Sequence, residues 1–303
     1  MMALRFGLFG TGYWAAETHG AVLATHPSAE LVGVWGRDPA KAQALAGRYG
    51  TRAYHDVDAL IDEADAVAVA LPPDVQADVA ARAADAGRHL LLDKPLAFNT
   101  VAADRVVAAV AARGSASVVF FTARFRPATE KFLAATAAQA GWHGARAVRF
   151  SANFTPGSPY AGSAWRRERG GLWDVGPHVL SVLLPVLGPV AEVVAMAGPR
   201  GTTHVLLRHT GGAVSTLGLS VDAAPAAVAS HVVFFGEPGT VEVPNDDCTA
   251  REAFGGAVDQ LALAAAGGPP PVCDVRFGRE VVAVLAAAEQ AHRLGRSVPV
   301  TRA

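Results

Sequence analysis

An acid and a base, Asp93 and Lys94, directly follow an aliphatic run at residues 90–92. A lysine ammonium in that position can donate to a reacting oxygen and stabilise the negative charge that develops there. Pro95 restricts the following backbone and fixes the direction of the lysine; its peptide bond with Lys94 is either cis or trans. Asp93 is expected to orient Lys94 or to contact a ligand. The alternative interpretation is a surface salt bridge at the end of a strand.

A second candidate pair, Asp174 and His178, lies in the sequence GGLWDVGPH at residues 170–178. Residues four apart share one face of a helix, so a helix over 172–187 would present both side chains together. An imidazole suits proton transfer near neutral pH, and a carboxylate can orient it. A single histidine on so apolar a helix is more often structural. Two polar residues in register after a double glycine favour a site.

The sequence FGTGYWAA at residues 9–16 places Gly10, Gly12 and Ala15 in a GxGxxA pattern. The first glycine permits a tight turn, the second lets the backbone approach a pyrophosphate, and the small third residue allows close helix packing. The helix N-terminus that follows offers N–H groups to a phosphate. At the first strand–helix junction the pattern indicates a bound dinucleotide. A plain glycine turn and a methyltransferase-type nucleotide site are the alternatives.

The end of the second strand bears on the choice of dinucleotide. NAD sites usually carry an acid there, which binds the adenine ribose. In LVGVWGRD, residues 31–38, Gly36 stands at that position, Arg37 follows, and Asp38 is better placed as a helix cap. Arg37 can pair with a 2′-phosphate or stack on adenine. We therefore expect the protein to bind NADP(H) in preference to NAD(H), although NAD(H) stays possible. The alternative interpretation of Arg37 is a solvated surface arginine that does not contact the cofactor.

Strands and helices alternate through the first third of the chain. Apolar strands separated by helices predict a parallel sheet covered on both faces, a doubly wound, Rossmann-type α/β domain over residues 1–122. Asp38-Pro39 and Asn99-Thr100 mark helix starts. The expected strands are 4–10, 30–36, 64–71, 88–93 and 116–121, and the expected helices are 13–25, 39–49, 75–86 and 101–113.

The pattern of extended and helical segments changes after residue 122. We expect residues 123–303 to form a second α/β domain with a large open, mostly antiparallel sheet. A loop rich in glycine and proline covers residues 155–171. Extended segments are expected at 191–198, 203–210, 213–220, 228–236 and 239–243, and helices at 128–140, 172–187, 250–266 and 276–294.

Composition narrows the possible functions. The formal net charge is −1 and 17% of residues are charged, which argues against nucleic acid or an anionic membrane as a partner. Cys248 and Cys273 have neither CxxC spacing nor a neighbouring histidine, so neither a metal site nor a disulfide is expected. No apolar run free of Gly, Pro or charge reaches membrane-spanning length, and we expect a cytoplasmic protein.

The glycine turn, the Asp-Lys-Pro sequence and the GGLWDVGPH segment, in this order, resemble the Gfo/Idh/MocA oxidoreductase family. The resemblance covers nearly the whole chain, including ARFRP around Arg124, WRRERGG at 165–171 and the closing helix from Phe277. The chain departs from the family pattern at several positions. Asp93 replaces a glutamate, Thr122 an asparagine and Ser181 an acid, and Pro73 and Gln76 lie where the family often has Asn and His.

The resemblance implies reversible hydride transfer between a nicotinamide and a hydroxyl-bearing carbon of a sugar, cyclitol or related polyol. His178 would accept the hydroxyl proton, Lys94 would stabilise the oxygen, and Asp174 would bind a neighbouring hydroxyl and orient His178. In the family the open sheet of the second domain commonly mediates oligomerisation, so the resemblance also implies a homodimer or homotetramer. Further substrate contacts are expected from Arg124, Tyr160 and Trp165. The cofactor contacts are expected from Gly10, Thr11, Gly12, Tyr13, Trp14, Arg37, Leu71, Pro72, Asp93, Lys94 and Arg166.

Two other functions stay open on the same fold. One is a non-catalytic, cofactor-binding regulatory protein, although such a protein has no need for Lys94, Asp174 and His178 together. The other is a glycosidase that uses a tightly held nicotinamide transiently during bond cleavage. Net formation of reduced cofactor separates a dehydrogenase from both.

Overall fold

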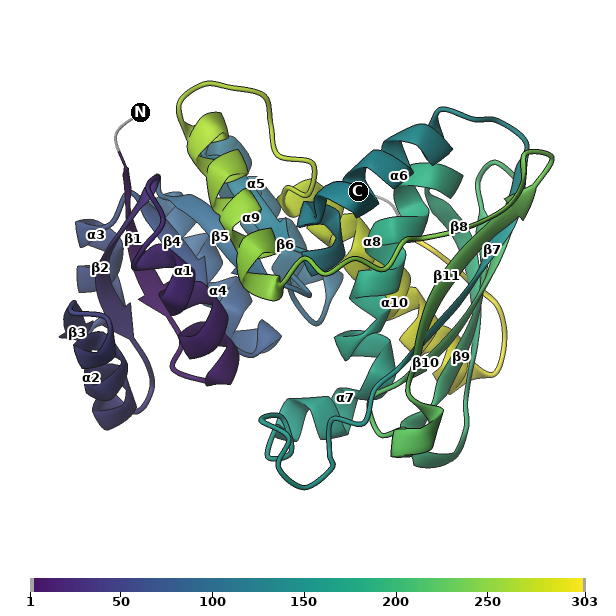
Figure 1. The fold of residues 1–303 in the computed structure, drawn as a ribbon, viewed down its shortest axis with the longest axis horizontal. Coiled ribbons are helices and arrows are strands. Elements are labelled where there is room, and N and C mark those ends of the chain that lie inside the picture. The colour runs from purple at the N-terminus through teal and green to yellow at the C-terminus, as the bar shows by residue number, and fades with distance from the viewer. Residues whose placement is uncertain (1–2, 302–303) are drawn as a thin grey trace. The chain divides into compact units, whose positions relative to one another are not determined.

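The computed structural model describes residues 3–301, which divide into two compact units (Figure 1). The first unit contains the chain up to Arg126 together with Asp247–Arg279. The second unit contains Pro127–Asp246 and the chain from Glu280 onward. The expected division into 1–122 and 123–303 made each part continuous in sequence. The compact units differ from it because a later segment returns to the first unit.

Aromatic packing explains this return. The ring of Phe254, in helix α9 (Ala250–Ala265), lies 4.2 Å from that of His19 and 5.0 Å from that of Phe120. Phe277 meets Phe121 edge-on at 5.5 Å. These side chains are contributed to the core by residues more than a hundred positions apart, a pairing that local sequence patterns do not reveal.

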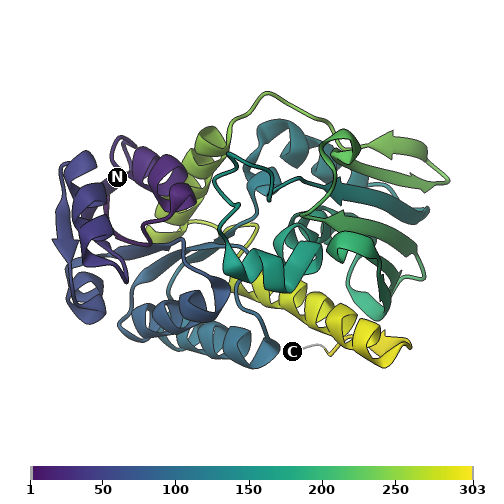
Figure 2. The same ribbon diagram turned by 90° about the horizontal axis from the view of Figure 1, so that it is seen from below.

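The first unit is built on a six-stranded parallel sheet, sheet A, with the order β3-β2-β1-β4-β5-β6. This is the strand order of a doubly wound dinucleotide-binding sheet, and it confirms the predicted fold class. In Figure 2, helices α4 and α5 lie side by side on one face of the sheet, and α9 lies on the other. The strands are β1 (Leu4–Phe9), β2 (Ala29–Trp35), β3 (Arg52–Tyr54), β4 (Ala66–Val69), β5 (His89–Asp93) and β6 (Ser117–Phe120).

The helix starts of this unit follow the predicted caps. The Asp38 carboxylate accepts bonds from the N–H groups of Ala40 and Lys41, and Asn99 accepts one from Ala102. The helices are α1 (Ala21–Leu23), α2 (Pro39–Arg48), α3 (Val57–Glu63), α4 (Pro73–Asp85) and α5 (Thr100–Arg113), with the 3₁₀ turn η2 (Thr122–Phe125). Strand β3 was not expected, because it is a three-residue edge strand with no alternating pattern. Helix α3 was not expected either; it has only seven residues.

The helix after the glycine turn was predicted as an α-helix over 13–25. Its central part is instead a π-helix, η1 (Ala15–Gly20), which continues into α1. His19 lies in this π-helix and is fully buried, and neither ring nitrogen has a hydrogen-bond partner within residues 3–301. Burial lowers the pKa of His19 to about 3, so the imidazole is neutral at ordinary pH.

The second unit is built on a seven-stranded sheet, sheet B, with the order β12-β11-β7-β10-β9-β8-β13. Strands β7 and β10 pair in parallel and the other neighbours are antiparallel, which confirms the mostly antiparallel sheet. The strands are β7 (Trp142–Phe150), β8 (Val190–Ala197), β9 (Thr203–His209), β10 (Val214–Ser220), β11 (Ala229–Gly236), β12 (Gly239–Glu242) and β13 (Val298–Pro299).

Helices of the second unit cover one face of sheet B, as Figure 1 shows. They are α6 (Pro127–Ala137), α7 (Ala164–Asp174), α8 (Gly176–Leu187) and α10 (Val275–Leu294, of which the part from Glu280 belongs here), with the 3₁₀ turns η3 (Pro199–Gly201) and η4 (Pro225–Ala227). The stretch Ala164–Leu187 is long and apolar enough to cross a membrane, but it is mostly buried inside the protein and has the character of a core helix.

Candidate active site

The glycine turn lies where β1 ends at sheet A. Gly10 has a φ of +133°, and a Cβ there would lie 2.5 Å from the carbonyl oxygen of Ala70, so only glycine fits. Around Gly12, by contrast, an added Cβ would meet no atom within 4 Å. Ala15 is fully buried, as expected for the small third residue of the pattern. The turn therefore leaves an open backbone cradle at a helix N-terminus, which fits a pyrophosphate.

Other predicted cofactor contacts follow the same edge of sheet A. Thr11 and Trp14 are half-buried, and the indole N–H of Trp14 is buried with no hydrogen-bond partner within the described chain. Tyr13 is 52% exposed. Leu71 and Pro72 follow β4, and Pro72 occupies the N-cap position of α4. These residues come from neighbouring strands of one parallel sheet, so their carboxyl ends share the edge at which ligands bind.

Gly36 and Arg37 follow β2 at that edge. A Cβ at Gly36 would lie 2.5 Å from the Cγ2 atom of Thr11, so an acidic side chain there would require the Thr11 side chain to move. Arg37 is exposed, whereas Asp38 is engaged as the cap of α2. No carboxylate is therefore placed at the position that binds an adenine ribose in NAD sites.

Lys94 follows β5 at the same edge. The Lys94–Pro95 peptide bond is cis, which settles the question that the sequence left open. The Asp93 carboxylate accepts a hydrogen bond from the backbone N–H of Lys94 at 2.9 Å. The Gln76 side chain, which the sequence marked only as a departure from the family pattern, donates to the carbonyl oxygens of Asp93 and Pro95. The turn that carries the lysine is therefore held through its backbone.

Asp174 ends α7 in the second unit and is only 4% exposed. Its Oδ2 atom accepts hydrogen bonds from Arg166 Nε at 3.0 Å and from Asn153 Nδ2 at 3.1 Å. Arg166 also donates to Ser163 Oγ at 3.3 Å. The acid is therefore held through its side chain by a cation and an amide, and Asn153 is a second residue that the sequence analysis missed.

Two aromatic rings border this cluster. The guanidinium carbon of Arg166 lies 4.5 Å from the ring centre of Tyr160 and 4.4 Å from that of Trp165. Such contacts add cation–π attraction and limit the freedom of the arginine. The structure thus brings together three residues that were predicted separately as cofactor or substrate contacts. It pairs Arg166 with Asp174; a contact of Arg166 with the cofactor stays a prediction.

His178 lies in the first turn of α8, and its carbonyl oxygen accepts a hydrogen bond from Ser181 Oγ at 2.8 Å. Every other residue from 171 to 184 is buried, whereas His178 is partly exposed. The predicted continuous helix over 172–187 is interrupted at Val175, where α7 and α8 meet, so Asp174 and His178 belong to consecutive helices. Arg124, a predicted substrate contact, is 8% exposed and lies over the Phe277 ring in the first unit.

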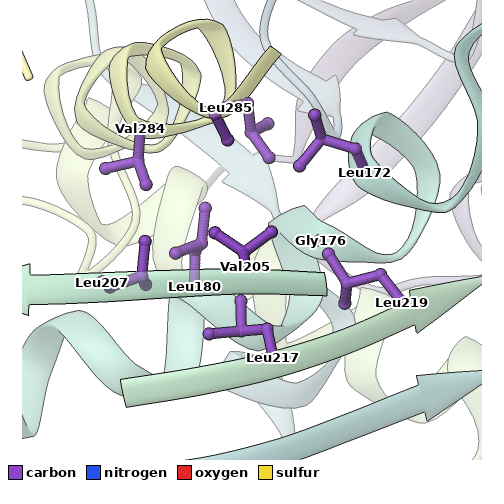
Figure 3. A pocket seen from close by; sticks show the side chains of 10 residues that line it. Leu172, Gly176, Leu180, Val205, Leu207, Leu217, Leu219, Val284 and Leu285 are labelled. Carbon is purple, nitrogen blue, oxygen red and sulfur yellow. The ribbon is translucent and has the colours of Figure 1, made fainter. Parts of the chain in front are cut away.

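A small cavity lies between the α7–α8 junction, sheet B and α10 (Figure 3). None of its lining side chains is polar, so the cavity offers no partner to water or to a sugar hydroxyl. We interpret it as a packing feature beneath the helices that carry Asp174 and His178. It is lined by Leu172, Gly176, Leu180, Val205, Leu207, Leu217, Leu219, Val284, Leu285 and Ala288.

No group of three or more His, Cys, Asp or Glu side chains in residues 3–301 is arranged to hold a metal ion. The side chains best suited to take part in a reaction are in the lysine turn of the first unit and in the Asp174 cluster of the second, together with His178.

Comparison with known proteins finds two matching family models. Residues 4–121 match the model of an oxidoreductase family with an NAD-binding Rossmann fold, and residues 134–242 match the Gfo/Idh/MocA C-terminal domain. A dTDP-3,4-didehydro-2,6-dideoxy-alpha-D-glucose 3-reductase of Streptomyces antibioticus is 29% identical over 256 residues, covering 79% of this chain and 75% of that protein.

Two further relatives extend the comparison. A D-xylose 1-dehydrogenase (NADP(+)) of Haloferax volcanii is 32% identical over 63% of this chain and 60% of its own length. The WlbA dehydrogenase of Bordetella pertussis, solved with NADH and UDP-GlcNAcA, superimposes with a TM-score of 0.87 at 25% identity, over 100% of this chain and 99% of that one. With both of its domains matched, the chain belongs to the Gfo/Idh/MocA family of NAD(P)-dependent oxidoreductases.

Proposed function

We propose that the chain transfers hydride between a nicotinamide cofactor and a hydroxyl-bearing carbon of a sugar, cyclitol or related polyol. One observation carries the proposal: the open glycine turn after β1 and the lysine turn after β5 lie at the same edge of sheet A. A phosphate cradle and an ammonium donor are thereby combined in one unit. The named activities of the relatives, reduction or oxidation of sugar carbons, support the substrate class.

The proposed roles divide the reaction among three side chains. In the oxidative direction His178 accepts the hydroxyl proton while the C–H electron pair leaves as hydride, and a C=O bond forms. Lys94 donates to the reacting oxygen and stabilises its negative charge. Asp174, fixed by Arg166 and Asn153, accepts a hydrogen bond from a neighbouring hydroxyl. Bound NAD(P)⁺ supplies the hydride acceptor.

A direct test is to titrate the purified protein with NADPH and NADH and then to assay a panel of sugars and polyols with the oxidised cofactor. Net formation of reduced cofactor with at least one substrate supports the dehydrogenase. Release of sugar from a glycoside without net reduction would favour the glycosidase. Tight cofactor binding without any turnover would favour the regulatory protein, and binding of neither cofactor would contradict all three functions.

We further propose NADP(H) as the preferred cofactor. The absence of a carboxylate at Gly36 and the exposed Arg37 beside it support the proposal. Arg37→Ala is expected to weaken NADPH binding by about 10-fold or more and NADH binding by less than about threefold, because only NADPH carries the 2′-phosphate. Arg113→Ala is the control: that exposed arginine lies at the C-terminal end of α5 and so away from the ligand edge. Equal losses of both cofactors would rule out Arg37 as the phosphate contact.

We also propose that the chain forms a homodimer or homotetramer through the face of sheet B that bears Val194, Met196 and Leu206. Val194 pairs with Leu206 across β8 and β9, and Met196 is 71% exposed. Adjacent exposed apolar side chains on a sheet favour association. Leu206→Glu is expected to shift the mass measured by light scattering to that of the monomer. An unchanged mass, or a monomeric parent protein, would contradict the proposal.

A further inference from the structure

Gln76, in the first turn of α4, is only 1% exposed. A buried primary amide must find partners for its two N–H donors and its oxygen, or it destabilises the protein. Within residues 3–301, every hydrogen bond of this amide leads to one segment, the turn from Asp93 to Leu96 that carries Lys94. All of its bonds thus hold the turn that carries Lys94. This distinguishes Gln76 from a buried polar residue whose hydrogen bonds only compensate for its own burial.

The bonds enclose Lys94 on both sides. Before the lysine, the Gln76 Oε1 atom accepts from the backbone N–H of Asp93 at 3.1 Å, and Nε2 donates to the Asp93 carbonyl at 2.7 Å. After the lysine, Nε2 donates to the Pro95 carbonyl at 3.0 Å, with the Leu96 carbonyl at 3.5 Å. Pro95 and Leu96 are buried, so their carbonyl groups depend on a protein donor.

Few side chains meet these requirements. The position needs an acceptor for Asp93 and a donor group shared by carbonyls on either side of Lys94. A glutamate of the same length has no donor and would place its oxygens against carbonyl oxygens. An asparagine keeps the amide but is shorter by one methylene, and a methionine keeps the volume but has no strong polar atom.

We propose that Gln76 is a positioning residue that fixes the direction of Lys94 toward the reacting oxygen. The inference rests on the catalytic role proposed above for Lys94. Gln76 acts only through the lysine turn: it fixes the backbone on both sides of Lys94, so that the ammonium is held in place before substrate binds. Such preorganisation is what a donor to a developing charge requires.

A double-mutant cycle tests this dependence. The parent, Gln76→Met, Lys94→Ala and the double variant are compared by single-turnover rates at saturating cofactor and substrate. Gln76→Met alone is expected to lower the rate by about 10- to 100-fold, because a misplaced donor loses most of its effect. In the Lys94→Ala background the same substitution is expected to cost less than about threefold, because the group it positions is gone.

Two further variants separate positioning from folding. Gln76→Asn should give an intermediate rate, because the amide is kept but displaced. Gln260→Met is the matched control, since the Gln260 side chain accepts its hydrogen bond from the backbone of Val272 in the same unit, at 3.4 Å, rather than bonding the lysine turn; its rate should stay within about twofold of the parent. Thermal midpoints and NADPH dissociation constants are measured for every protein.

The outcomes distinguish this inference from the proposed function. If Lys94→Ala keeps the parental rate, the catalytic role of the lysine is wrong. If Lys94→Ala is slow and Gln76→Met lowers the rate by the same factor in both backgrounds, the role of Lys94 survives and positioning by Gln76 is wrong. Failure of both Gln76→Met and Gln76→Asn to fold would assign Gln76 to the stability of the first unit and also overturn the inference.

Discussion

In the lysine turn of the first unit, hydrogen bonds hold the backbone around Lys94. In the Asp174 cluster of the second unit, they hold the side chain of Asp174. Around Lys94, the bonds of Gln76 and Asp93 engage backbone N–H and carbonyl groups. Around Asp174, Arg166 and Asn153 engage the carboxylate itself. A backbone-held residue can lose its side chain while the turn keeps its bonds. A residue held by its side chain carries structure and chemistry in the same group, so replacing it disturbs both.

The largest effect is expected at Lys94, where a substitution should greatly reduce activity and hardly change stability. Lys94→Ala should lower kcat by about 10²- to 10³-fold, because it removes a donor to the reacting oxygen. The free energy of unfolding should change by less than about 1 kcal/mol, since the backbone bonds of the turn remain. Steady-state kinetics and urea denaturation of the same preparation measure both quantities.

Asp174→Ala provides the contrast. It should lower both activity and stability, because the partly buried Arg166 loses its carboxylate. A Lys94→Ala protein that loses as much stability as Asp174→Ala would show that the two sites are not held differently.

A smaller effect is expected at Arg166. Arg166→Met keeps much of the aliphatic volume between the Tyr160 and Trp165 rings but removes the cation beside a carboxylate that is only 4% exposed. We expect a loss of about 2–4 kcal/mol in the free energy of unfolding. Arg167→Met, at the exposed neighbouring arginine, should cost about 1 kcal/mol or less. Equal losses at the two positions in urea denaturation would mean that the charge on Arg166 does not hold Asp174.

Local signals in the sequence predicted much of this arrangement. The cap at Asp38-Pro39 and the apolar strands gave the helix starts and the parallel sheet correctly, because such features depend on near neighbours. Gln76 and Asn153 were missed as parts of the site because each bonds a segment 17 or more residues away. A polar residue on a helix or in a loop shows no periodic pattern that reveals a distant partner.

Arg166 illustrates a second limit of the sequence. The WRRERGG segment that contains it resembles a family motif, and Arg166 was expected to contact the cofactor. The structure pairs it with Asp174, eight residues along the chain. Residue type alone does not decide between these partners, because a guanidinium binds phosphates and carboxylates alike. Only the course of the loop before α7 places the carboxylate within its reach.

The comparison extends to two buried histidines, where the smallest effects are expected. His19 of the first unit has no hydrogen-bond partner for either ring nitrogen within residues 3–301, whereas His209 of the second donates to the Gly188 carbonyl at 2.8 Å and accepts from Ser215 Oγ at 2.9 Å. His19→Leu should raise the free energy of unfolding by about 1 kcal/mol, and His209→Leu should lower it by about 1–3 kcal/mol. Urea denaturation at pH 8 measures both changes; a loss of stability in His19→Leu would mean that its ring packing outweighs its unsatisfied nitrogens.

The pH dependence of stability sharpens the contrast at His19. Burial lowers its pKa in the folded protein to about 3, against about 6.5 when the chain is unfolded. Between these values only the unfolded chain binds the proton, so the contribution of His19 to stability is complete above about pH 6.5 and falls by up to about 1.4 kcal/mol for each unit below it. His19→Leu removes this slope. The difference in the free energy of unfolding between His19→Leu and the parent, measured by urea denaturation, should therefore increase as the pH falls from about 6.5 to 4.5. It should stay constant above about pH 6.5. Parallel curves throughout would show that the imidazole reaches water, or gains a partner, before the protein unfolds.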